Sequence, residues 1–123
     1  MSDDYVIVLT TMAGDADVEA LARTIVEEQL AACVSVLPPM RSIYRWEGQV
    51  EEAVERQVVM KTSRASVSAL RDRLHELHPY DVPEFLVLPI VDGSEAYLKW
   101  ISGSVRTYGP ANLRTHGPED PRT

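Results

Sequence analysis

The pattern of apolar and polar positions predicts an alternation of strands and helices. Residues 5–11 form a dense β-branched run, typical of a strand that is buried on both faces. From residue 18 to residue 30, apolar side chains recur at i, i+3, i+4, i+7, i+8 and i+12, which predicts an amphipathic helix. Residues 33–37 predict a second strand, which Pro38 and Pro39 interrupt because proline cannot donate a backbone hydrogen bond to a sheet.

A long hairpin is predicted in the middle of the chain. Residues 42–46 and 50–62 have strand character, and Gly48 lies between them, where a tight turn needs a positive φ. Four glutamates make this hairpin acidic: Glu47, Glu51, Glu52 and Glu55. They predict either a weak cation site or, more simply, a solvated hairpin that resists aggregation.

The second half of the chain predicts two more helices and another strand. A helix is expected between a cap at Ser63 and the proline at position 79, with its apolar stripe at Val67, Leu70, Leu74 and Leu77. Residues 85–90 predict a strand, and Ser94 is a candidate cap for a third helix that reaches Val105.

The element order β-α-β-β-α-β-α predicts an α+β fold. Crossovers after the first and third strands, with a hairpin between them, are the split βαβ or ferredoxin-like arrangement. Such a chain forms a four-stranded antiparallel sheet with two helices on one face. The other face and the hairpin edges would then be uncovered, so we expect the chain to form a homo-oligomer.

Length and composition narrow the class of protein. At 123 residues we expect one domain over residues 1–106, followed by a disordered tail over 107–123, where prolines and glycines replace large aliphatic residues. The net charge of −7 argues against nucleic acid as a partner. The single cysteine, Cys33, has the apolar neighbours of a buried structural thiol. No secretory signal or membrane span is evident, so we expect a cytoplasmic protein.

Residues 78–84 read His-Pro-Tyr-Asp-Val-Pro-Glu and are the most informative segment. Its two prolines fix two φ angles and push the preceding residues toward extended backbone. The segment is therefore either a rigid joint between helix and strand or a stiff connection that presents site chemistry.

Five segments in register carry a resemblance to a known family. They are Leu-Ala-Ala-Cys-Val at 30–34, Tyr-Arg-Trp-Glu-Gly at 44–48, Met-Lys-Thr at 60–62, residues 78–84, and Tyr-Leu-Lys-Trp-Ile at 97–101. With these motifs the chain resembles the CutA family, named for divalent-cation tolerance, from about residue 5 to residue 106. The resemblance implies a ferredoxin-like subunit in a homotrimer, with sheets inside and hairpins reaching onto neighbours. It also implies an architecture similar to that of the PII signalling proteins, which bind small molecules in clefts between subunits.

The family resemblance also bears on metal binding. Members described as copper-binding have a cysteine near the end of the first strand and two adjacent histidines before the Pro-Tyr pair. Thr10, Leu77 and His78 stand at these positions here, so His78 alone carries over as a candidate metal ligand. A hydroxyl and a leucine do not replace a thiolate and an imidazole for copper.

The residues themselves offer a second argument for a metal. His75 and His78 are three apart, so a helix would place them on roughly the same side, with Asp81 and Glu84 nearby. Such a set suits Cu(II) or another divalent cation, although no cofactor is required. The alternative is a solvated or capping pair of histidines.

A small-ligand cleft is the other candidate site. Tyr44 and Trp46 alternate along a strand and therefore share a face. The cleft candidates are Tyr44, Trp46, Lys61, Tyr80, Glu84 and Trp100. If they converge across a subunit boundary, they suit a small anionic ligand held by Lys61. The alternative is that the aromatic residues anchor the subunit interface.

Motifs of catalysis are absent from the sequence: there is no Gly-rich phosphate loop, GxSxG or HExxH. We therefore expect a non-enzymatic, cytosolic homotrimer linked to divalent metal (copper) tolerance. The alternatives are a PII-like small-ligand sensor and a purely structural trimer with incidental metal affinity.

Overall fold

The computed structural model describes residues 4–106, so the tail predicted for residues 107–123 lies outside the described residues. The elements follow in the order β1 (Tyr5–Ala13), α1 (Val18–Glu27), β2 (Cys33–Val36), β3 (Met40–Trp46), β4 (Gln49–Ser63), η1 (Arg64–Ser66), α2 (Val67–Leu77), β5 (Leu86–Pro89) and α3 (Glu95–Ser104). This is an α+β fold with an antiparallel sheet, as predicted, but the sheet has five strands within the described residues rather than four, because β2 and β3 are separate strands on either side of the two prolines. None of the helices in this part of the chain is long and apolar enough to span a membrane.

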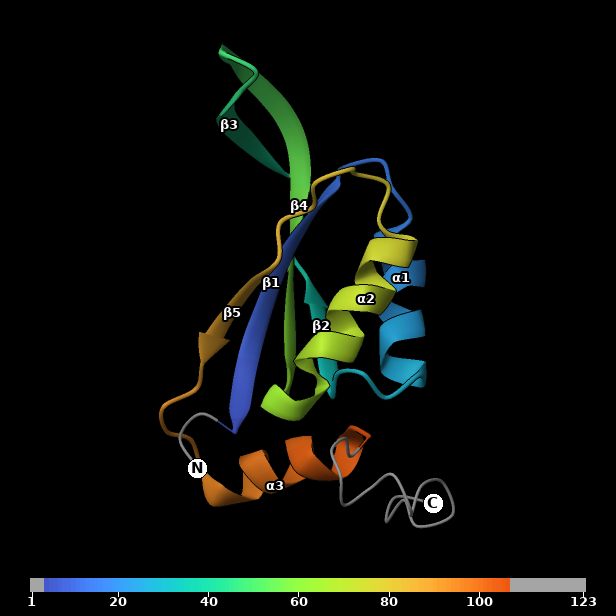
Figure 1. Ribbon diagram of the computed structural model, residues 1–123, viewed down its shortest axis with the longest axis vertical. Helices are drawn as coiled ribbons and strands as arrows, with labels where there is room; N and C mark the ends of the chain where they lie inside the picture. Colours follow the sequence, from blue (N-terminus) through green and yellow to red (C-terminus); the bar gives the residue numbers. More distant parts are fainter. Residues whose placement is uncertain (1–3, 107–123) are drawn as a thin grey trace.

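The sheet is organised around β4, which runs for 15 residues. Its strand order is β2-β4-β1-β5, every neighbouring pair is antiparallel, and β3 pairs with the first part of β4. In Figure 1 the β3–β4 hairpin projects beyond the body of the molecule. The predicted long hairpin is therefore confirmed. Its turn lies at Glu47 and Gly48, whose φ angles are 51° and 80°.

Two boundaries differ from the prediction. Ser63 does not cap a helix, because its hydroxyl bonds Ser66 Oγ at 3.0 Å and the turn of η1 precedes α2. The first helix ends at Glu27 rather than near Leu30, since Gln29 has a φ of 63° and turns the chain toward β2. The cap at Ser94 is confirmed, because its Oγ accepts a hydrogen bond from the Tyr97 backbone N–H.

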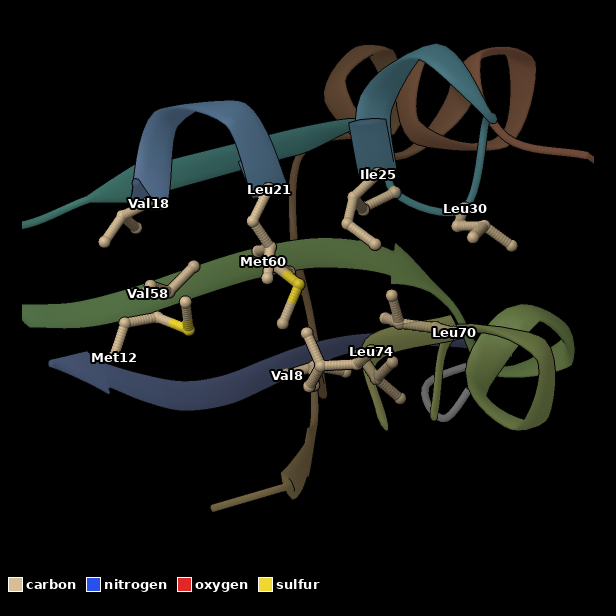
Figure 2. Close-up of a cluster of buried hydrophobic side chains, with 12 residues drawn as sticks. Val8, Met12, Val18, Leu21, Ile25, Leu30, Val58, Met60, Leu70 and Leu74 are labelled. Atoms are coloured by element: carbon tan, nitrogen blue, oxygen red, sulfur yellow. The ribbon is translucent and has the colours of Figure 1, made fainter. Parts of the chain in front are cut away.

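The hydrophobic core lies between one face of the sheet and the helices α1 and α2. Alternate residues of β1 and β4 point toward the helices, and Figure 2 shows their side chains meeting those of Leu21, Ile25, Leu70 and Leu74. Every second side chain of a strand points to the same face, and the apolar side chains of each helix recur about every 3.6 residues on one side, so the two apolar surfaces meet in this layer. The core residues are Val6, Val8, Met12, Val18, Leu21, Ile25, Leu30, Ala31, Val58, Met60, Leu70 and Leu74.

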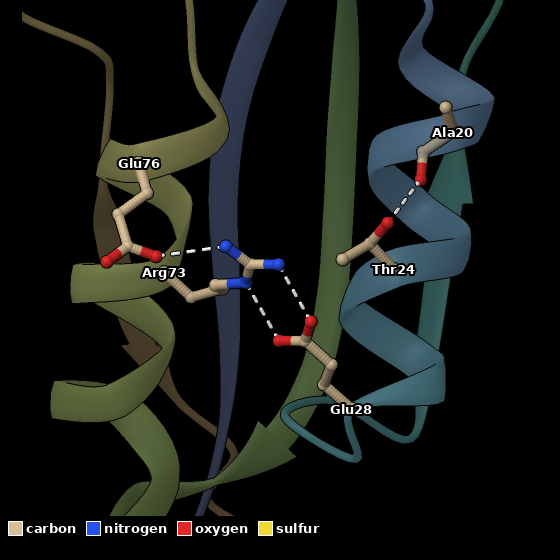
Figure 3. A network of polar contacts seen from close by, with 5 residues as sticks. All are labelled: Ala20, Thr24, Glu28, Arg73 and Glu76. Carbon is tan, nitrogen blue, oxygen red and sulfur yellow. Dashed lines mark hydrogen bonds and ion pairs between the residues drawn. The ribbon is translucent and has the colours of Figure 1, made fainter.

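A charged bridge joins the two helices at the surface of this layer. Arg73 of α2 donates from Nε and Nη2 to the two carboxylate oxygens of Glu28, both at 2.8 Å, and from Nη1 to Glu76 at 3.0 Å. Figure 3 shows this fork. The hydrogen bonds to Arg73 lower the pKa of Glu28, and the same bonds raise the pKa of Arg73.

The opposite face of the sheet, here called the open face, is apolar at its centre, and α1 and α2 do not cover it. Its residues are the odd-numbered positions of β1 and β4 and their β5 partners: Ile7, Leu9, Val59, Leu86 and Leu88. Leu86 and Leu88 remain 54% and 43% exposed. Helix α3 reaches one end of this face, where Lys61 Nζ lies 5.7 Å from the centre of the Tyr97 ring.

Candidate functional site

A cleft of about 750 Å³ opens on the same side of the sheet as the open face, at the base of the hairpin. Strand pairing explains why its walls come together. Tyr44 and Trp46 alternate on β3, and Glu55 and Gln57 continue the same side along β4. Thr11 faces Gln57 across the β1–β4 pair. The full lining is Thr11, Met40, Ser42, Tyr44, Trp46, Glu55, Gln57, Tyr80, Asp81, Val82, Pro83 and Glu84.

The loop after α2 forms the second wall of the cleft, and His78 fixes it in place. The ring of His78 is 7% exposed. Its Nε2 lies 2.7 Å from the Thr11 carbonyl oxygen, and its Nδ1 accepts a hydrogen bond from the Tyr80 backbone N–H at 3.1 Å. A single imidazole thus ties the loop to both β1 and its own backbone.

These two hydrogen bonds define the state of His78. Because a backbone N–H can only donate, Nδ1 carries a lone pair, and because a carbonyl can only accept, Nε2 carries the proton. Burial lowers the pKa of His78, against the hydrogen bond to Thr11, which raises it. The ring is neutral, and both its nitrogens are engaged within the protein.

Tyr80 is held in its protonated form. Its hydroxyl donates to Glu55 Oε2 at 2.9 Å, and burial together with this carboxylate raises the pKa of Tyr80 to about 12. Gln57 Nε2 donates to the Thr10 carbonyl at 2.7 Å and to Glu84 Oε2 at 3.2 Å. Among the described residues, the cleft lining includes three acidic side chains, Glu55, Asp81 and Glu84, and no lysine or arginine.

The six residues predicted to form a cleft divide into two groups within one chain. Tyr44, Trp46, Tyr80 and Glu84 line the cleft. Trp100 belongs to α3, where its ring centre is 5.3 Å from that of Tyr97, and Lys61 Nζ approaches the same Tyr97 ring from β4. Their convergence was predicted across a subunit boundary and stays a prediction for the oligomer.

The residues that stand at the family's copper-binding positions do not fit a copper ion. The ring nitrogens of His78 are both hydrogen-bonded, Leu77 has no donor atom, and the buried Oγ1 of Thr10 has no hydrogen-bond partner among the described residues. His75 is exposed, and its Nδ1 lies 2.9 Å from the Arg71 carbonyl oxygen. Within residues 4–106, no group of three His, Cys, Asp or Glu side chains is placed to hold a metal.

Cys33 differs from its predicted setting. It is half-buried rather than fully buried, and it pairs with Lys61 across β2 and β4, with its Sγ 3.7 Å from Ser35 Oγ. The sequence reasoning also missed Thr11, Glu55 and Gln57 as cleft residues. Their signal was the alternation along β1 and β4, which becomes informative only when the strand register is known.

Comparison with known proteins places the chain in a family. The family model described as "CutA1 divalent ion tolerance protein" matches residues 6–104. The chain belongs to this family. The divalent-cation tolerance protein CutA of Pectobacterium atrosepticum is 44% identical over 103 residues, which cover 84% of this chain and 94% of that protein. The CutA of Thermus thermophilus is 42% identical over 95 residues, which cover 77% of this chain and 92% of that protein.

Solved structures agree with this assignment to the CutA1 family. The crystal structure of CutA1 from Oryza sativa superposes with a TM-score of 0.82 at 36% identity, covering 87% of this chain and 98% of that one. The Thermus thermophilus protein superposes with a TM-score of 0.80 at 39% identity, covering 83% of this chain and 99% of that one. The antiparallel sheet and three helices described above are therefore the fold of the family.

Proposed function

We propose that this chain is a non-catalytic, cytoplasmic protein of divalent-cation tolerance that works as a homotrimer of ferredoxin-like subunits. Membership of the CutA1 family and the names of its curated relatives support the tolerance role. The strand order β2-β4-β1-β5, with α1 and α2 on one face, supports the ferredoxin-like topology.

The observation that carries the oligomer is the amount of apolar surface left open. The open face has Leu86 and Leu88 half exposed at the sheet edge. On the other side of the hairpin, Ile43, Val50 and Val54 are 69%, 68% and 59% exposed. Large apolar side chains gathered at the surface in this way are typical of subunit interfaces, and a second and third copy would cover both groups.

The tolerance role proposed here does not use His78 as a copper ligand. Its ring is a structural element that holds the cleft loop, and donating a lone pair to a metal would break the bond from the Tyr80 backbone N–H. Tolerance would then arise through the assembled trimer rather than through sequestration of copper at this position.

Two measurements on matched variants test this function. Sedimentation velocity should give a trimer for the wild type and smaller species for Leu86→Glu, whereas Val26→Glu, a similarly exposed position on α1, should remain trimeric. In cells that lack their own relative and grow in Cu(II), the wild type and His78→Asn should both restore growth, and Leu86→Glu should not. A monomeric wild type, or rescue that depends on His78, would contradict the proposal.

A second candidate function, a small-ligand sensor with PII-like architecture, is favoured by the cleft. The cleft opens beside the surface proposed for subunit contact, at the base of a hairpin that would reach a neighbour. A ligand bound there would alter the hairpin position and thereby report its presence to the other subunits.

A further inference from the structure

The walls of the cleft are aromatic on two sides. Tyr44 and Trp46 come from β3 and are 42% and 51% exposed, and Tyr80 comes from the loop opposite. Aromatic rings offer a negative electrostatic face, which attracts ammonium and guanidinium groups. The walls therefore suit a positively charged ligand with apolar parts.

Gln57, Tyr80 and the two glutamates that they contact present hydrogen-bond acceptors to the cleft. Both amide hydrogens of Gln57 are used, by the Thr10 carbonyl and Glu84 Oε2. The hydroxyl hydrogen of Tyr80 is used by Glu55. What these side chains still offer a ligand is the amide oxygen of Gln57 and the lone pairs of the Glu55 and Glu84 carboxylates. A ligand that matches them must donate.

The charge of the lining points the same way. Glu55, Asp81 and Glu84 line the cleft, and the nearby ring of His78 is neutral. Lys61, on which the expectation of an anionic ligand depended, lies four residues from Gln57 along β4, which is about 13 Å of strand. An anion in this cleft would face carboxylates without a compensating cation from its lining.

An organic cation fits better than a metal ion. In the described part of the chain, the acidic side chains are not gathered into a metal-binding group of three. They are spread along a cleft of about 750 Å³, which is the size of a site for an extended small molecule. Ammonium groups separated by a carbon chain would meet carboxylates at separate points and aromatic rings between them.

We propose that this cleft binds an organic polycation, a molecule with two or more protonated amino groups on an aliphatic chain. The proposal rests on the second candidate function above and names the ligand class of that same site.

Isothermal titration with spermidine as the probe tests the proposal. Wild-type protein should bind it saturably, and Glu84→Gln and Trp46→Leu should each weaken the affinity at least tenfold, about 1.4 kcal/mol. Glu27→Gln on α1 removes the same charge away from the cleft. This control should not change the affinity by more than about twofold, or about 0.4 kcal/mol.

The outcomes separate this proposal from the proposed function. Equal weakening by Glu84→Gln and Glu27→Gln would mean diffuse attraction to an acidic protein and would overturn the proposal. Tighter binding of ATP or of Mg²⁺ than of spermidine would also overturn the proposal. If sedimentation shows a trimer that binds no spermidine, a neighbouring subunit fills the cleft; the ligand proposal is then overturned, and the proposed homotrimer is kept. If the protein is a monomer that still binds spermidine, the ligand proposal is kept, and the proposed homotrimer is overturned.

Discussion

Replacing His78 should destabilise the protein by an amount that its contacts define. His78→Ala removes two hydrogen bonds, with Thr11 O and Tyr80 N, at about 1 kcal/mol each. It also removes the contacts of a ring that is 7% exposed and packs with its centre 4.8 Å from that of Tyr80, a loss of roughly 1–2 kcal/mol. The expected decrease in the free energy of unfolding is about 3–4 kcal/mol.

His78→Asn divides this loss. The asparagine Oδ1 can take the place of Nδ1 and accept from the Tyr80 N–H, but its side chain is too short to reach the Thr11 carbonyl. We therefore expect a decrease of about 2 kcal/mol for this variant. If both hydrogen bonds of the ring contribute to stability, His78→Asn should lose part of the free energy of unfolding that His78→Ala loses.

The same ring predicts how stability depends on pH. Burial lowers the pKa of His78 from its ordinary value of 6.5. The folded protein thus keeps the ring neutral where the unfolded chain begins to take up a proton, so the ring's contribution is complete above about pH 6.5. That contribution is lost as the pH falls from there toward the folded-state pKa. The wild type should lose more stability than His78→Asn between about pH 7.5 and pH 5.5.

Urea unfolding, followed by circular dichroism at one protomer concentration, measures both effects. His75→Asn is the matched control for the loss of an imidazole, because His75 is exposed and its replacement should cost much less stability than His78→Asn. The reasoning is refuted if His78→Ala costs less than about 1 kcal/mol, or if His78→Asn keeps the full pH dependence of the wild type.

Three other substitutions test separate features of the fold by the same unfolding assay. Thr10→Val should stabilise the protein by about 1 kcal/mol, because the buried Thr10 hydroxyl has no hydrogen-bond partner within residues 4–106; a clear loss of stability would show that it has one. Gly48→Ala should cost about 1 kcal/mol of stability, because Gly48 has a φ of 80°, which strains the backbone of any residue with a Cβ. The added methyl group meets nothing within 4 Å, so backbone strain is the cause of the loss, and an unchanged urea midpoint would contradict it. Arg73→Ala should lower the urea midpoint more at low salt than at high salt, because it removes the fork to Glu28; equal shifts at both salt concentrations would contradict an ionic contribution.

Much of the fold could be predicted because the apolar periods are regular. The stripe from residue 18 and the β-branched run at residues 5–11 identify α1 and β1, and Gly48 identifies the hairpin turn. The boundaries that failed are those decided by tertiary contacts. Ser63 bonds Ser66 instead of capping a helix, and Gln29 adopts a positive φ without being glycine.

The candidate site was less accessible from the sequence. Tyr44, Trp46, Tyr80 and Glu84 could be singled out as chemistry-bearing residues, and the structure brings these four together. The sign of the site's charge could not be predicted, because it depends on which residues β4 presents beside them. Register selects Glu55 for the cleft, and Lys61 lies farther along the same strand.

The same limit applies to His78. The spacing to His75 suggested a pair of ligands on one side of a helix, but α2 ends at Leu77. His78 is in extended backbone with a φ of −85° and a ψ of 135°, as the proline that follows it requires. Its ring is thereby directed into the fold, whereas His75 stays at the surface.

Native mass spectrometry of metal-stripped protein, titrated with Cu(II) alongside His78→Asn, tests most directly the claim that this CutA1-family chain is a trimer with a structural rather than metal-binding His78. We predict a trimer that retains no stoichiometric copper and whose copper uptake is the same in both proteins. A monomer, or a trimer that takes up one Cu(II) per subunit and loses it in the variant, would contradict the account.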